Sequence, residues 1–146
     1  ITVEVEVREE ISESKEPLTD NAQVDVKLKE TTCDVCGKLS SGYYEAILQI
    51  RGEGDLSEDR LAGITDVLRK DFIEKRDRSR EEFVSQVKRK HGGLNVYTSS
   101  SKMAEDMARF LKNEYGGEMD ESAELIGQTE DGEDNYRVTV VVRLPF

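Results

Sequence analysis

The sequence has 146 residues, of which 36% are hydrophobic and 36% charged, and its formal net charge is −11 at pH 7. This length fits one domain that buries about two-thirds of its unfolded surface, with room for a small appended unit. The acidic balance argues against a general nucleic-acid-binding protein, because phosphate binding depends on clustered Lys and Arg. No apolar run approaches the roughly 20 residues of a membrane-spanning helix, and no signal-peptide pattern is present. We therefore expect a soluble, cytoplasmic protein.

The first 32 residues are predicted to form a β-ribbon with an acidic loop. Apolar and polar residues alternate strictly over 1–8 and again over 24–29, which is typical of strands with one buried and one solvated face. The two strands are expected to pair antiparallel. The segment 9–22 between them is acidic, contains Pro17 and lacks periodicity, so we expect a mobile loop there.

Residues 33–146 are predicted to form one α+β domain that opens with a Cys-x-x-Cys knuckle. Cys33 and Cys36 are the only cysteines, and Gly37 and Lys38 follow them. This spacing lets one tight turn present two thiolates to a tetrahedral zinc ion. A structural zinc site needs four ligands, and the single histidine, His91, is distant in sequence. Zinc is therefore expected in the full-length protein and is expected to be absent from, or weakly held by, this fragment.

Two other interpretations of the cysteine pair remain open. One is a metal-free tight turn between two strands. The other is a thioredoxin-like redox motif, in which the first cysteine follows a strand and lies at a helix N-terminus. Because a strand is expected to follow Cys36, the redox interpretation is the weaker one. A pair of closely spaced cysteines suits a reducing compartment better than a secreted disulfide scaffold.

The middle of the chain predicts a strand at 43–51 and then two helices. The first helix is expected over 56–75, after Asp55 or Ser57 as N-cap, because apolar residues recur every three to four positions at Leu61, Ile64, Leu68 and Phe72. The second is expected over 79–91, since Ser79 and Glu82 have the spacing of a capping box. It would bury Phe83, Val84 and Val87 and end at Gly92-Gly93.

The remaining sequence predicts a strand, a helix and two strands. The strand covers 94–98, and the helix starts at 99–101 with an apolar stripe of Met103, Met107, Phe110 and Leu111 that we expect in the core. This helix ends at a second glycine pair, Gly116-Gly117. Strands at 118–128 and 136–143 follow. The predicted fold is a two-layer α+β domain with a mixed or antiparallel sheet and about three helices, plus the N-terminal β-ribbon.

Basic residues are concentrated between 75 and 91, where seven of them against three acidic ones give +4, leaving −15 for the rest of the chain. One basic face on an acidic body suits oriented docking. The Lys88-Arg89-Lys90 cluster is also explained by a helix C-terminus, where cations complement the dipole. Three arginines in the predicted connection, namely Arg76, Arg78 and Arg80, have no such explanation and are candidate phosphate contacts. The alternative for them is a solvated face.

Three motifs in order carry a family resemblance: the cysteine knuckle, Gly42-Tyr-Tyr-Glu-Ala-Ile-Leu-Gln-Ile-Arg-Gly52, and Tyr136-Arg-Val-Thr-Val-Val-Val-Arg-Leu-Pro145. They resemble the protein family named for nonsense-mediated mRNA decay, whose eukaryotic members are the nuclear export adaptor of the 60S ribosomal subunit. The spelling resembles the archaeal branch. Members of this family begin with paired Cys-x-x-Cys motifs that form a zinc-binding region, so we expect this chain to be an excised fragment of a longer protein.

The resemblance implies a module that binds the large ribosomal subunit, through rRNA and ribosomal proteins, during subunit maturation. Nuclear export is implied for the eukaryotic relatives only. Tyr43 and Tyr44 lie on opposite faces of their strand, so at least one is available for stacking, although tyrosine is also simply a good strand former. The candidate RNA or partner contacts are Tyr43, Tyr44, Arg51, Arg76, Arg78, Arg80, Lys88, Arg89 and Lys90, and the candidate metal ligands are Cys33 and Cys36.

Two other classes of function were weighed against this one. An enzyme is disfavoured, because the sequence has no Gly-rich phosphate loop and no Ser-His-Asp arrangement. The alternative to RNA docking is a protein-interaction module in which the ribbon of residues 1–8 and 24–29 adds a strand to a partner, without RNA contact. Salt dependence separates the two, since RNA docking weakens steeply with salt.

Overall fold

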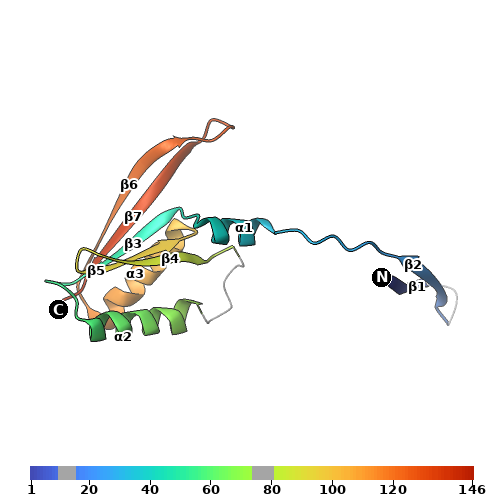
Figure 1. The fold of residues 1–146 in the computed structure, drawn as a ribbon, viewed down its shortest axis with the longest axis horizontal. Helices are drawn as coiled ribbons and strands as arrows, with labels where there is room; N and C mark the ends of the chain where they lie inside the picture. The colour runs from blue at the N-terminus through green and yellow to red at the C-terminus, as the bar shows by residue number, and fades with distance from the viewer. Residues whose placement is uncertain (10–15, 74–80) are drawn as a thin grey trace. The chain divides into compact units, whose positions relative to one another are not determined.

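The computed structural model describes residues 1–9, 16–73 and 81–146. The chain forms two compact units, Ile1–Thr32 and Cys33–Phe146, and Figure 1 shows the elements of each. Within the described ranges, no helix is long and apolar enough to cross a membrane.

The N-terminal unit is a two-stranded antiparallel sheet of β1 (Thr2–Glu9) and β2 (Leu18–Asp25). Its register runs from Thr2 opposite Asp25 to Glu9 opposite Leu18. This confirms the predicted strand pair, but the second strand begins at Leu18, inside the predicted loop, and residues 26–29 are not in a strand. The sequence of β2 is rich in Asp, Asn and Gln, so its local strand propensity is weak and the strand could not be predicted there. Cross-strand pairing with β1 outweighs this weak propensity.

The second unit contains a five-stranded mixed sheet in the order β4-β5-β3-β7-β6, which confirms the predicted α+β class. The central strand β3 pairs parallel with β7 and antiparallel with β5, and the outer pairs are antiparallel. The strands are β3 (Ala46–Arg51), β4 (Val84–Lys90), β5 (Gly93–Thr98), β6 (Glu118–Gln128) and β7 (Asp134–Arg143).

Three α-helices accompany the sheet in the described residues: α1 (Asp34–Ser41), α2 (Glu58–Leu68) and α3 (Ser101–Tyr115). Figure 1 shows α2 and α3 together on one side of the sheet. The side chains of Ser57 and Ser100 cap them by accepting the amides of Arg60 and Met103. The helix predicted over 56–75 is confirmed from Glu58 onward, and it continues as a π-helical turn, η1 (Arg69–Ile73). Residues 74 and 75 of that prediction lie outside the described residues.

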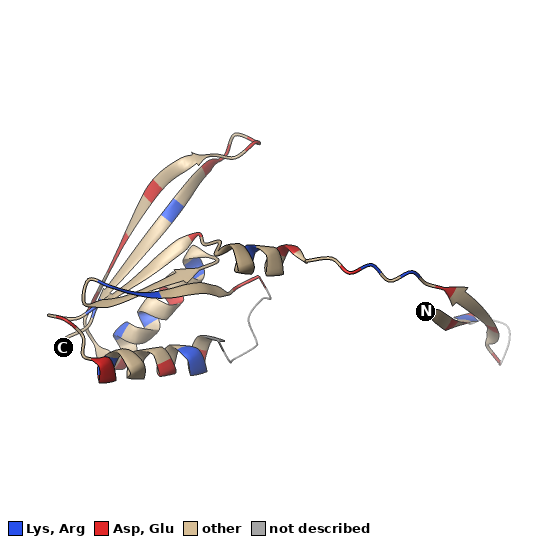
Figure 2. Ribbon diagram, in the orientation of Figure 1, with Lys and Arg blue, Asp and Glu red and all other residues tan. Residues whose placement is uncertain are grey.

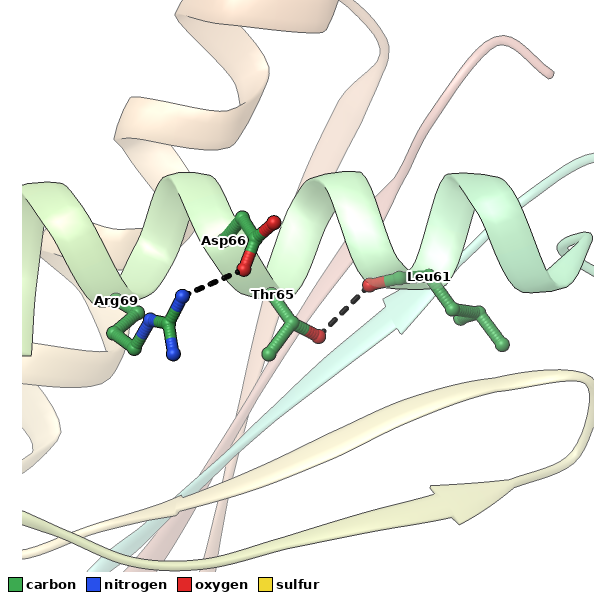
Figure 3. A network of polar contacts seen from close by, with 4 residues as sticks. All are labelled: Leu61, Thr65, Asp66 and Arg69. Atoms are coloured by element: carbon green, nitrogen blue, oxygen red, sulfur yellow. Dashed lines mark hydrogen bonds and ion pairs between the residues drawn. The ribbon is translucent and has the colours of Figure 1, made fainter.

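Two local polar contacts lie along α2 and its π-helical extension (Figure 3). Arg69 Nη2 lies 3.0 Å from Asp66 Oδ1, and the hydroxyl of Thr65 donates to the carbonyl of Leu61 at 2.8 Å. The Thr65 bond is the usual way a β-branched hydroxyl satisfies itself inside a helix. Leu61, Ile64 and Leu68 are the residues of α2 that are buried in the core.

The core lies between the sheet and α2 and α3. Apolar residues at the predicted helical positions are buried in it, together with alternate residues of the three central strands. The buried set includes Leu61, Ile64, Leu68, Phe72, Met103, Met107, Leu111, Leu48, Ile50, Leu94, Val96, Val140 and Val142. Phe110, also predicted in the stripe, is partly buried and meets Phe72 edge to face at 5.3 Å. The methionine stripe is thus core, as predicted.

The helix predicted over 79–91 is wrong, because Val84–Lys90 form strand β4. Residues 79 and 80 of that prediction lie outside the described residues. Lys90 pairs with Gly93 across a two-residue turn in which His91 and Gly92 both have positive φ, 50° and 68°. This is the geometry of a type I′ hairpin, which matches the twist of the flanking strands. The glycine pair is therefore a hairpin signal, and the prediction that it ends a helix is wrong. Val87, predicted to be buried, is exposed.

Candidate nucleic-acid interface

Strand β3 divides the sheet into a covered face and an open face. Ala46, Leu48 and Ile50 are buried against the helices, whereas Ile47, Gln49 and Arg51 alternate with them and are only half-buried. The open face continues on the neighbouring strands through the residues opposite them in the ladder, which include Tyr97, Asn95, Thr139, Val141 and Arg143.

An aromatic and cationic stack crosses this open face. The ring of Tyr44, just before β3, meets the ring of Tyr97 in β5 edge to face, with 4.8 Å between centroids. The guanidinium of Arg137 in β7 lies 4.3 Å from the Tyr44 centroid, and the ammonium of Lys88 in β4 lies 5.3 Å from the Tyr97 centroid. Each ring therefore has a cation over it, within the range of cation–π attraction.

Arg137 is held mainly by this stacking. Its Nε is shielded from solvent and has no hydrogen-bond partner in the part of the chain that the structure describes. A buried donor left unsatisfied is costly, so its position in a folded protein calls for an explanation. The guanidinium is therefore oriented by the Tyr44 ring, with donors that an incoming acceptor can use.

Arg51 has a structural role in the same region. Its Nη1 donates to the carbonyls of Ile50 and Leu94, each at 3.0 Å, and its Nη2 donates to Asn95 Oδ1 at 2.7 Å. Burial lowers the pKa of Arg51 below its ordinary value. These contacts hold the Arg51 side chain against β5. Its charge is part of the open face, but its guanidinium already donates three hydrogen bonds within the sheet.

The predicted basic cluster of β4 is split by strand alternation. Lys88 lies over Tyr97 on the open face, and Lys90, two residues on, shares that face. Arg89 points to the other side, where its guanidinium forms an ion pair with Glu58 at the start of α2. The prediction that all three lie at a helix C-terminus is wrong, and two of them, Lys88 and Lys90, lie on the candidate surface.

Tyr43 belongs to a different surface from Tyr44. Its hydroxyl donates to Glu45 Oε1 at 2.6 Å, and this hydrogen bond, together with burial, raises the pKa of Tyr43 to about 12. The ammonium of Lys38 lies 4.9 Å from the Tyr43 centroid. The ring borders a cavity of about 460 Å³ whose lining includes the acidic side chains of Asp34, Glu45, Glu81 and Glu82. That lining is unfavourable for phosphate.

The comparison with known families decides the identity of the second unit. The family model for the second domain of NMD3 matches residues 43–144. This chain belongs to the NMD3 family. The family is involved in ribosome biogenesis, is associated with the 60S subunit, and is a family of ribosome-binding adaptors rather than a known enzyme family. Among curated proteins, no match to the chain was found.

The NMD3 match covers the whole open face and leaves out the cysteine pair. It begins at Tyr43, whereas the resemblance in the sequence extended back to Cys33. Within the match lie both rings of the stack and the cations above them. The open face therefore lies within the part of the chain that matches the NMD3 second domain.

The cysteine pair opens a helix, not a turn between strands. Cys33 is the N-cap of α1, its Sγ accepts the amide of Cys36 at 3.3 Å, and both side chains are exposed. The argument that a strand follows Cys36 is therefore wrong, and so is the tight-turn alternative. In the described ranges no group of three or more His, Cys, Asp and Glu residues could hold a metal. Two exposed thiols with an amide facing one of them fit half of a four-ligand zinc site.

Three predicted site residues cannot be placed, and three residues of the open face were not predicted. Arg76, Arg78 and Arg80 lie outside the described residues, so their role stays a prediction. Tyr97, Asn95 and Arg137 were missed. Alternation over 94–98 could have placed Asn95 and Tyr97 on one face, but the pairing of β3 with both β5 and β7 brings distant segments together and leaves no local signal.

Proposed function

We propose that this chain binds the large ribosomal subunit during its maturation by placing rRNA on the open face of the five-stranded sheet. The stack of Arg137, Tyr44, Tyr97 and Lys88 carries the proposal. Unpaired bases stack on aromatic rings and on guanidinium planes, and nearby ammonium groups take the phosphates. Tyr97 is 7% exposed and Tyr44 half-buried, so Tyr44 and Arg137 form the accessible part of the platform and Tyr97 supports them.

The charge on this face gives the bound RNA a direction. Basic residues follow β4 at one edge, whereas β6 at the other edge carries acidic residues (Figure 2). Alternation places Lys88 and Lys90 on the open face of β4, and Glu118, Asp120 and Glu124 on the same face of β6. Phosphates are attracted to the first edge and repelled by the second, so the backbone of the RNA should run along the β4 side.

The biological task follows from the family. Eukaryotic members act in 60S export, but the spelling of this chain is similar to the archaeal branch, in which no nucleus has to be crossed. We assign to this chain the older part of the work: cytoplasmic binding of the large subunit during maturation, which would also keep that subunit from joining prematurely.

We propose that zinc is held at Cys33 and Cys36 only together with ligands from outside the described residues. Cys33 and Cys36 would supply two thiolate ligands, and zinc would act there structurally by fixing the first turn of α1. Two further ligands must come from other parts of the protein or the assembly. Subunit binding by the open face does not depend on this site, because the matched domain begins after it.

Co-sedimentation with purified large and small subunits tests the proposal. The chain should pellet with the large subunit alone, and a Lys88→Gln/Lys90→Gln variant should lower the salt slope of binding by about 1.4–1.8, since each phosphate contact contributes about 0.7–0.9. Lys102→Gln/Lys112→Gln on α3 is the matched control, because it removes the same charge from exposed positions on the helix side. If the salt slope falls equally in both variants, net charge explains the effect and the proposed role of Lys88 and Lys90 is contradicted.

A second candidate function is protein binding by the N-terminal ribbon. One observation favours it: Val3 and Val24 are directly opposite each other, Val5 is two residues further along the same face, and all three remain exposed. An isolated two-stranded sheet is marginally stable, and a partner covering these valines would stabilise it. Binding through the ribbon should tolerate salt and be lost in Val3→Thr/Val5→Thr, without sensitivity to Lys88 or Lys90.

A further inference from the structure

The outer part of the β6–β7 hairpin extends beyond the rest of the sheet. Strand β3 pairs with β7 only from Val138 to Arg143, whereas β6 follows β7 back to Asp134. Figure 1 shows these two strands projecting away from the body of the domain. We call residues 125–136 the arm. In the arm, β7 has β6 as its neighbour on one side and no described strand on the other.

The face that forms the core in the body of the domain becomes exposed in the arm. Val140 and Val142, on the covered face of β7, are 0% exposed. Two residues earlier than Val138 on the same face, Tyr136 is 49% exposed, and its direct cross-strand partner Leu125 is 54% exposed. The apolar pattern of the core thus continues past the helices that cover it.

A β-bulge directly after Leu125 adds a third exposed apolar residue to the arm. The register shifts between Leu125 and Gly127, which leaves Ile126 as the extra residue, and Ile126 is 45% exposed. Bulges of this kind re-aim side chains and often lie next to functional sites. The Tyr136 hydroxyl donates to Asp134 Oδ2 at 3.4 Å, and Gln128 donates to Asp134 Oδ1 at 2.9 Å. These bonds hold the Tyr136 ring in place before any partner arrives, which lowers the entropic cost of binding.

The charge around this patch determines what can cover it. Residues 118–137 contain one basic residue, Arg137, and eight acidic ones: Glu118, Asp120, Glu121, Glu124, Glu130, Asp131, Glu133 and Asp134. Such a surface repels RNA phosphates, and it repels the same hairpin of a second copy. An apolar centre with an acidic rim is complementary to a protein that presents an apolar pocket surrounded by Lys and Arg.

We propose that the arm docks on a basic protein surface, with Tyr136, Leu125 and Ile126 as its anchors. This inference rests on the proposed function, because the partner is then a basic protein exposed on the large subunit. RNA on the open face and protein on the arm are separate contacts on one domain, and their affinities combine through the rigid sheet that joins them.

A double substitution and a photo-cross-linker test the arm. Leu125→Gln/Tyr136→Gln should weaken large-subunit binding about tenfold, since truncated aromatic anchors commonly cost that much. The control is Leu39→Gln on α1, where Leu39 is 45% exposed and lies outside the arm. Because all three positions are exposed, the variants should keep the wild-type melting temperature, which is measured in parallel. Wild-type binding by the arm variant overturns the inference while leaving the RNA proposal intact.

The cross-linker separates this contact from RNA docking. Ile126→benzoylphenylalanine is irradiated with intact large subunits and, separately, with the rRNA-free protein extract of the same subunits. Attachment to one Lys- and Arg-rich protein in both samples, abolished by Leu125→Gln/Tyr136→Gln, supports the arm even if sedimentation shows no RNA-dependent binding. Attachment to rRNA alone, to a second copy alone, or to nothing overturns it.

Discussion

The ring of Tyr44 lies edge to face against the ring of Tyr97, at an interplanar angle of 80°. Tyr44 precedes the central strand and Tyr97 belongs to the next strand of the sheet, 53 positions later in the chain. This contact links the start of β3 to β5 on the open face, and the guanidinium of Arg137 stacks on the Tyr44 ring. Removing this contact should therefore lower both the free energy of unfolding and the affinity for RNA.

Tyr44→Ala should lower the free energy of unfolding by about 1–2.5 kcal/mol, the sum of an aromatic pair and a cation–π contact. It should also weaken binding to the large subunit, because one stacked base is worth about 1–3 kcal/mol. Tyr44→Phe keeps the ring and should behave as wild type in both respects. Urea titration and subunit co-sedimentation measure the two effects. Full binding by the Ala variant would remove Tyr44 from the interface.

Gly93→Ala should destabilise the second unit although the residue gained is small. A Cβ at this position would lie within van der Waals overlap of the Ile50 carbonyl oxygen, which belongs to the neighbouring strand β3. Backbone cannot move aside as a side chain can, so the sheet must shift at a cost of about 1–3 kcal/mol or more. Thermal unfolding checks this. Gly54→Ala is the control, because nothing lies near a Cβ there.

The sequence predicted much of this fold because several elements carry strong local signals. The stripe from Met103 to Leu111 and the serine caps determine α3, and β-branched runs mark β3 and β7. The prediction for 84–90 was wrong because Val84 and Val87 have helical spacing, whereas the strand forms by pairing with β5. Local periodicity cannot show that a Gly92 turn will bring a second strand alongside.

The candidate site was predictable only in part for the same reason. Tyr44 and Lys88 were identified from residue type, but their neighbours Tyr97 and Arg137 come from strands whose order in the sheet is set by non-local pairing. A period-2 pattern tells which residues share a face of one strand, and it does not tell which strand lies beside it. The helix at Cys33 was missed because a helix of eight residues carries little periodic signal.

The stability contributed by the Tyr43 hydroxyl should depend on pH. The pKa of Tyr43 rises from 10.0 to about 12 in the folded protein, chiefly through the hydrogen bond to Glu45. A raised folded pKa means that this stabilisation is complete below pH 10 and is lost as pH climbs through about 12. The difference in unfolding free energy between wild type and Tyr43→Phe should therefore be constant below pH 10 and shrink above it. A difference that stays flat up to pH 12 would contradict the assigned contact.

Cys33→Ser/Cys36→Ser should leave the second unit folded, with a change in unfolding free energy within about 0.5 kcal/mol. Both side chains are exposed, and serine at position 33 remains a good N-cap. The variant should lose any zinc held by the chain and keep its binding to the large subunit. Metal analysis after dialysis, melting temperature and co-sedimentation are measured on the same preparation. Unfolding on chelation of wild type would show instead that the pair forms a complete site.

The most direct test of the central claim is ultraviolet cross-linking of the chain to purified large subunits, followed by mass spectrometry of the peptides that carry nucleotides. If rRNA lies on the open face, the cross-linked positions should cluster at Tyr44, Gln86, Lys88 and Lys90, and should disappear from Tyr44→Ala samples. Cross-links confined to α2 and α3, on the covered side of the sheet, or to the N-terminal ribbon would contradict the account.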